Sequence, residues 1–172
     1  MTVIDLIREQ VKSSHELMES TISGVSDEVV HFNETNKALP VGAAYAHAVI
    51  SEDVILSTMI LKTAPLSSDN LRTGLSIPMT SFSEWDKYEE WVKSVKIDLP
   101  KLQSFAQEVY GATDKYLASL TDADLEKEID TGGMGKYTLS HLLTNFIILH
   151  NASLAGEVSA AKGFQGHKGY PF

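Results

Sequence analysis

The stretch 146–163, FIILHNASLAGEVSAAKG, decides the fold that this chain is expected to adopt. Its apolar residues recur at helical spacing that extends back to residue 139. On a helical wheel one face of 139–162 collects Leu139, Leu143, Phe146, His150, Leu154 and Glu157. The pattern predicts a helix over 139–162, closed by Gly163, with His150 facing inward. Such a histidine is either a core residue with a hydrogen-bond partner or one half of a binding site.

Helical patterns also fill most of the chain before this segment. They predict a helix over 2–23, a second over 40–62, and a third pattern over 84–120 that Pro100 interrupts or restarts. Residues 63–84 and 121–138, rich in turn-forming residues, are expected to be loops, and the glycine-rich tail 163–172 to pack back on the helices. The prediction is an all-α, single-domain four-helix bundle over 1–172, with long connections between its helices.

Composition excludes several classes of function. The 172 residues carry 14 Lys and Arg against 23 Asp and Glu, a formal net charge of -9, and the basic residues form no cluster that would bind nucleic acid. No continuous apolar segment is long enough to span a membrane or serve as a signal peptide, so a cytoplasmic location is expected. The absence of cysteine excludes disulfides, thiolate ligands and a cysteine nucleophile.

Three of the six histidines are predicted to face the core. His47 shares a face of the second helix with apolar residues, as His150 does in the last helix, and His15 lies near the apolar stripe of the first. Metal sites in bundles are built from side chains on facing helices, which makes His47 and His150 a candidate pair. Each one alone is better explained as a hydrogen-bonded core residue than as a ligand. His141 points the opposite way from His150, and His31 and His167 are expected in exposed loops.

The segments VGAAYAHAVISEDVIL (41–56) and YTLSHLLTNFIILHNASLAGEVSAAKGFQGHKGYPF (137–172) resemble the DinB-like (DinB/YfiT) family of four-helix bundles. Members carry a histidine in the second helix, in a context like His-x4-Glu, and His-x3-His-x-Gly-Gln/Glu in the last. The resemblance implies that the three histidines hold a divalent ion such as nickel or zinc. His47 with Glu52, and His150 with Gly156 and Glu157, match these elements, but Leu154 stands where the third ligand is expected.

No residue near Leu154 is an obvious replacement ligand. Glu157 lies about 10.5 Å further along the helix axis than His150, too far to share an ion with it. Glu52 points about 140° away from His47 and is better interpreted as a second-shell or inter-helix partner. His15 would serve only if the first helix places it at the same level, and Asn151 and Ser51 are weaker candidates. Nickel, zinc or iron would therefore bind weakly or not at all.

Three functions remain open from the sequence. The resemblance implies a metal-dependent transferase or isomerase that uses a low-molecular-weight thiol against an electrophilic substrate, with His47 and His150 as ligands and the 61–84 connection at the entrance. The incomplete ligand set argues against full activity. The second is a non-catalytic, metal-free bundle that binds a small molecule, and the third is a protein-interaction module such as a homodimer.

Overall fold

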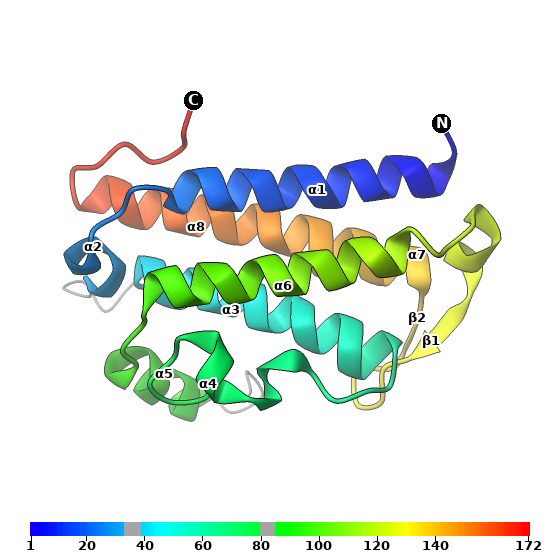
Figure 1. The fold of residues 1–172 in the computed structure, drawn as a ribbon, viewed down its shortest axis with the longest axis horizontal. Coiled ribbons are helices and arrows are strands. Elements are labelled where there is room, and N and C mark those ends of the chain that lie inside the picture. The colour runs from blue at the N-terminus through cyan, green and yellow to red at the C-terminus, as the bar shows by residue number, and fades with distance from the viewer. Residues whose placement is uncertain (33–38, 80–84) are drawn as a thin grey trace.

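The computed structural model describes residues 1–32, 39–79 and 85–172, and it is mostly helical. In the described chain, four long helical segments run side by side, with α1 and α6 in front of α8 and α3 in Figure 1. They are α1 (Val3–Ile22), α3 (Val41–Val54) with the π-helical turn Ile55–Ile60, α6 (Leu99–Leu117), and α7 (Leu139–His141), π-helical Leu142–Leu149 and α8 (His150–Phe164) in succession. The all-α class predicted from the sequence is confirmed.

Side-chain caps explain where the long helices begin. Thr2 forms a capping box with Asp5 at the start of α1, and the Asp98 carboxylate accepts a hydrogen bond from the Lys101 amide at the start of α6. Pro100 lies in the first turn of α6, where its missing N–H costs nothing, so it restarts the helical pattern. No helix in the described part of the chain combines the length and the apolar character that crossing a membrane requires.

The core extends along the whole bundle in two hydrophobic clusters. One surrounds Tyr45, Phe105 and Leu154, and the other surrounds Leu117 and Leu142 near the amino-terminal end of α1. The first part of α3 is buried on every side, from Val41 to Ala46, because it packs against α8, α6 and α2. Its small residues allow the neighbouring helices to pack closely against it.

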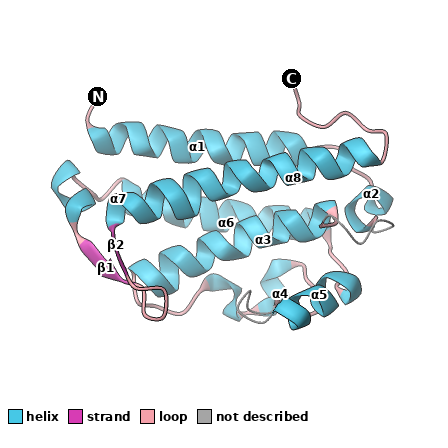
Figure 2. Ribbon diagram, turned by 180° about the vertical axis from the view of Figure 1, so that it is seen from behind, coloured by secondary structure: helices cyan, strands magenta, loops and turns pink. Residues whose placement is uncertain are grey.

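Short elements accompany the four long segments, and the sequence predicted only one of them, the short helix that begins near residue 84. They are α2 (Asp27–His31), α4 (Asn70–Thr73), α5 (Trp85–Ser94), the 3₁₀ turns Leu66–Ser68 and Asp122–Glu126, and the hairpin β1 (Glu128–Asp130) and β2 (Lys136–Thr138) seen in Figure 2. The prediction that 121–138 is only a loop was wrong, because three-residue strands are too short to show alternation. Residues 80–84 of the predicted 63–84 connection lie outside the described residues.

The carboxy-terminal tail packs against α8, as the sequence predicted. The helix continues to Phe164, one residue beyond the Gly163 expected to close it. The buried Lys162 ammonium then donates hydrogen bonds to the carbonyls of Thr21 and Gly169, which ties the tail to the end of α1. Gly169 lies directly against Ser159, so the backbone of the tail follows the surface of α8 closely.

Candidate functional site

His47 and His150 meet in the structure, as the helical-wheel argument predicts. His47 lies in the middle of α3, and His150 is the first residue of α8, directly after the π-helical segment. Their ring centroids are 4.9 Å apart with an interplanar angle of 61°, an edge-to-face contact. Both side chains are partly buried. Two imidazoles from different helices therefore form the centre of a candidate site.

The surroundings keep both imidazoles neutral at pH 7. Burial, helped by the neighbouring His150, lowers the pKa of His47 to about 4. Burial also lowers the pKa of His150, an effect that the negative charge of Glu52 opposes. A neutral imidazole has one N–H donor and one nitrogen lone pair, so each ring can both donate and accept a hydrogen bond.

Aromatic side chains of α5 border the pair. The Tyr88 ring lies 6.0 Å from that of His47, edge to face, and it stacks on Trp91 at 5.5 Å. Burial raises the pKa of the Tyr88 hydroxyl, and the nearby charge of Glu157 raises it further, so this hydroxyl stays protonated. The site thus combines two neutral imidazoles with a phenol, and the Trp91 indole packs behind that phenol.

Glu157 does not face the interior, which corrects the helical-wheel prediction. Its side chain is exposed, although burial is sufficient to raise the pKa of its carboxyl group. The wheel assumed 100° per residue throughout 139–157, whereas the segment Leu142–Leu149 is π-helical and has more residues per turn. That segment changes the direction of Leu139 and Leu143 relative to His150. His150 and Glu157 both lie in α-helical α8 and share a side, so only the exposure of Glu157 departs from the prediction.

The residues present do not fit the three-histidine ion that the resemblance implies. Leu154 is only 3% exposed and belongs to the hydrophobic core, so it fills the third position with a methyl-bearing side chain. Within the described residues, no group of three or more His, Asp or Glu side chains is arranged to hold a metal. Two imidazoles alone are fewer protein ligands than either structural or catalytic zinc sites use.

Glu52, 1% exposed, joins all four long helical segments through one carboxylate. It accepts hydrogen bonds from His15 Nε2 on α1 at 2.8 Å, from Thr113 Oγ1 on α6 at 2.6 Å and from Asn151 Nδ2 on α8 at 2.7 Å. Glu52 is thus an inter-helix partner, one of the two roles that the sequence analysis considered. His15 and Asn151 bond to this carboxylate and do not replace Leu154 as ligands.

A second polar cluster, which was not predicted from the sequence, lies beside Glu52. The Tyr110 ring stacks on His15 with centroids 3.8 Å apart. The hydroxyls of Tyr45 and Tyr110 both donate to Glu19 Oε1, at 2.6 and 3.1 Å. The four-residue spacing of His15 and Glu19 places both on one face of α1, and this spacing was the signal that could have revealed the cluster.

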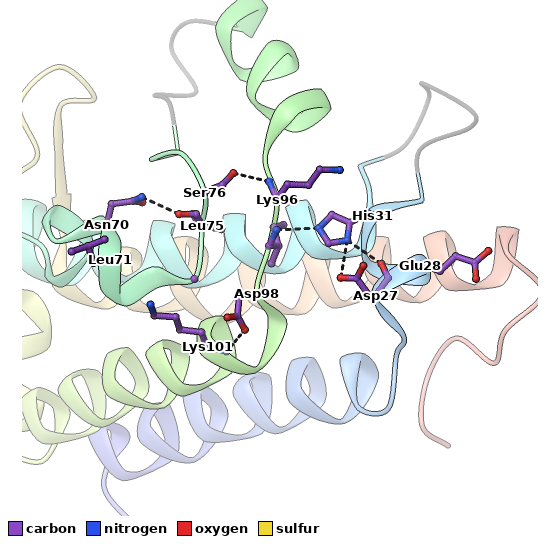
Figure 3. Close-up of a pocket in the computed structure, with 12 residues that line it drawn as sticks. Asp27, Glu28, His31, Asn70, Leu71, Leu75, Ser76, Lys96, Asp98 and Lys101 are labelled. Atoms are coloured by element: carbon purple, nitrogen blue, oxygen red, sulfur yellow. Dashed lines mark hydrogen bonds and ion pairs between the residues drawn. The ribbon is translucent and has the colours of Figure 1, made fainter.

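His31 is not the solvent-exposed loop residue that the sequence suggested. It ends α2, and it borders a pocket of about 650 Å³ that Figure 3 shows between α2, α4 and the start of α6. Its Nδ1 lies 2.9 Å from the Asp27 carbonyl, and its Nε2 accepts a hydrogen bond from the Ile97 amide at 3.0 Å. These bonds hold the ring in place. His141 and His167 are exposed, and none of the predicted site residues lines this pocket.

Comparison with known proteins gives a structural relative but no family. No family model matches the chain, and no curated protein matches it. A solved structure, described as the crystal structure of the conserved protein of locus from Enterococcus faecalis, superposes with a TM-score of 0.77. The match covers 94% of this chain and 96% of that chain at 19% sequence identity. At this identity the likeness shows a shared fold alone.

Proposed function

We propose that the chain is a DinB-type four-helix bundle without a resident metal, and that it binds a small polar molecule at the His47 and His150 pair. The observation that carries the proposal is the contact between the two neutral imidazoles. The buried Leu154 fills the position next to them where the third ligand is expected. The side-by-side packing of the four long helical segments supports the choice of fold type.

The chemistry of the pair favours binding over catalysis. A histidine whose pKa is about 4 is a weak base, far from the value near the working pH that general acid–base catalysis requires. Neutral imidazoles beside Tyr88 and Trp91 instead suit a ligand with a hydrogen-bond donor, an acceptor and an apolar part. Small amides and thiols have these properties.

A divalent-metal-dependent transferase or isomerase that uses a low-molecular-weight thiol is the second candidate. One observation favours it: both imidazoles are unprotonated at neutral pH, as metal ligands must be. The two candidates differ in whether nickel, zinc or iron is present at all. Metal content therefore separates them.

Metal analysis of untagged protein, followed by zinc titration of the wild type and of Leu154→His, tests the proposal. We expect no stoichiometric metal in the wild type. Leu154→His, which completes the three-histidine set, should bind zinc at least about 100-fold more tightly than the wild type. Leu154→Met is the matched control for a change of packing at this position, and it should bind zinc no better than the wild type.

Two results would contradict the metal-free assignment: stoichiometric metal in the wild type, or equal zinc affinities of the wild type and Leu154→His. Binding of small molecules is tested separately, by recording the side-chain nitrogen NMR signals of His47 and His150 with a set of small amides and thiols. A set that shifts neither signal would argue against the binding function.

A further inference from the structure

A groove of about 870 Å³ separates α1 from α6, and its lining includes no residue of the His47 and His150 pair. It is bordered by His15 and Glu19 of α1 and by Tyr110 and Asp114 of α6. The two helices lie next to each other in Figure 1. Because the groove lies apart from the pair, an inference about it does not depend on the proposed function.

The floor of the groove contains a buried imidazole with one open nitrogen. His15 is 8% exposed, and its Nε2 lies within 3.0 Å of both oxygens of the Glu52 carboxylate. A carboxylate only accepts hydrogen bonds, so Nε2 carries a proton, and in the neutral ring Nδ1 then carries the lone pair. Nδ1 makes no hydrogen bond to any described residue. Stacking on Tyr110 fixes the plane of the ring.

A second open acceptor lies one helical turn further along α1. Glu19 Oε1 accepts hydrogen bonds from Tyr45 and Tyr110, which hold the carboxylate in place. Within the described chain, its other oxygen, Oε2, has no hydrogen-bond donor. Burial raises the pKa of this carboxyl group, an effect that the hydrogen bonds from Tyr45 and Tyr110 oppose. His15 and Glu19 are four residues apart, a rise of about 6 Å.

The charge around these acceptors is negative. Five carboxylates line the groove, from Asp5, Glu9, Glu16, Glu19 and Asp114, against the two cations Arg8 and Lys12. Both cations are already paired, Arg8 with Asp114 in a bidentate contact and Lys12 with Glu16 at 3.6 Å. Both cations are thus paired with carboxylates of the groove itself, and the remaining excess of negative charge surrounds the open acceptors of His15 and Glu19.

We infer that this groove binds a small organic amine cation, whose N–H groups donate to His15 Nδ1 and Glu19 Oε2. Three features select this ligand: two oriented acceptors, an excess of negative charge, and an aromatic side chain beside them. An anion would be repelled. A metal ion would lack ligands, because no three-ligand group exists among the described residues.

Titration with 1,4-diaminobutane at physiological salt tests the inference. Binding should move the Nδ1 nitrogen NMR signal of His15, a readout in the wild-type protein that no folding defect can mimic. Glu19→Gln, whose amide oxygen still accepts from both tyrosines, should weaken binding by about tenfold or more, because the charge-assisted hydrogen bond is lost. Glu126→Gln removes the same charge from an exposed site outside the groove and should leave the affinity unchanged.

An Nδ1 signal that does not respond to 1,4-diaminobutane would overturn the inference. So would equal weakening by Glu19→Gln and Glu126→Gln, since binding would then reflect only the net charge of the protein. A lysine-containing peptide with blocked termini provides the second arm of the titration. Tighter binding of this peptide than of the diamine would contradict the assignment of a free amine and identify a protein side chain as the ligand.

Discussion

The hydrogen bonds to the Glu52 carboxylate are expected to contribute strongly to the stability of the fold. This carboxylate is buried and accepts hydrogen bonds from His15, Thr113 and Asn151. Glu52→Ala removes the acceptor and leaves three donors without a partner inside the bundle. We expect the free energy of unfolding, measured by urea denaturation, to fall by about 3–5 kcal/mol.

Glu126→Ala is the control for Glu52→Ala, since this side chain is exposed and its loss should change the free energy of unfolding by less than about 0.5 kcal/mol. Glu52→Gln should fall between the two, because an amide keeps the shape and one acceptor oxygen but loses the charge. A Glu52→Ala loss below about 1 kcal/mol would show that the donors find water or other partners.

The low pKa of His47 predicts a dependence of stability on pH. The folded-state pKa of about 4 lies below the ordinary value of 6.5, so the unfolded chain binds the proton more readily. This contribution is present above pH 6.5 and is lost as the pH falls from 6.5 toward 4. Allowing for solvent screening of a partly exposed ring, the loss should be about 1–2 kcal/mol.

Urea denaturation at several pH values checks the role of His47, with His47→Gln as the variant that cannot titrate. The wild type should lose more stability than His47→Gln between pH 6.5 and 4. Parallel curves would contradict the prediction. A direct NMR titration of the His47 ring should give a midpoint near pH 4, well below that of an exposed histidine such as His167.

At the scale of elements, Gly74 allows the end of α4 to pack closely against the start of α6. Its φ is +76°, and a Cβ added there would lie 2.7 Å from the Asp98 carbonyl oxygen and 2.8 Å from the Leu102 amide nitrogen. Gly24 has nearly the same backbone, with φ of +71°, but nothing within 4 Å. Substitution of Gly24 therefore measures the free-energy cost of a side chain at positive φ alone, and substitution of Gly74 adds the cost of a steric clash.

Alanine substitution should distinguish these two glycines. Gly24→Ala should destabilise the protein by about 1–2 kcal/mol, the cost of a left-handed residue alone. Gly74→Ala should cost at least about 1–3 kcal/mol more, because the methyl group meets backbone atoms that cannot move independently. Thermal or urea unfolding of both variants measures the difference, and equal losses would show that α6 shifts to accommodate the methyl group.

Helical periodicity predicted the long elements well and the short ones poorly. It placed α1, α3, α6 and the last helix within a few residues, and it brought His47 to His150. It missed α2 and the β1–β2 hairpin, whose lengths of three to five residues give no readable period. It grouped Glu157 with the inward-facing residues although this side chain is exposed, because a helical wheel gives the direction of a residue and not how much of the chain covers it.

At the scale of the whole molecule, Lys162 joins the tail to the end of α1. Lys162→Met keeps the aliphatic length but leaves the Thr21 and Gly169 carbonyls without this donor. We expect the tail to open more often, so that chymotrypsin cleaves after Phe164 several-fold faster under native conditions. Lys115→Met, an exposed change on α6, should leave the cleavage rate unaltered. Equal rates in both variants would show that Gly169 and Tyr170 hold the tail without Lys162.

The Glu52 carboxylate has a consequence for how the molecule comes apart. It has partners on α1, α6 and α8 and itself belongs to α3, so the departure of any one helix breaks at least one of its hydrogen bonds. An intermediate with three docked helices would keep a poorly solvated negative charge with too few donors. Such intermediates are penalised, which favours cooperative, all-or-none unfolding over the stepwise loss of helices.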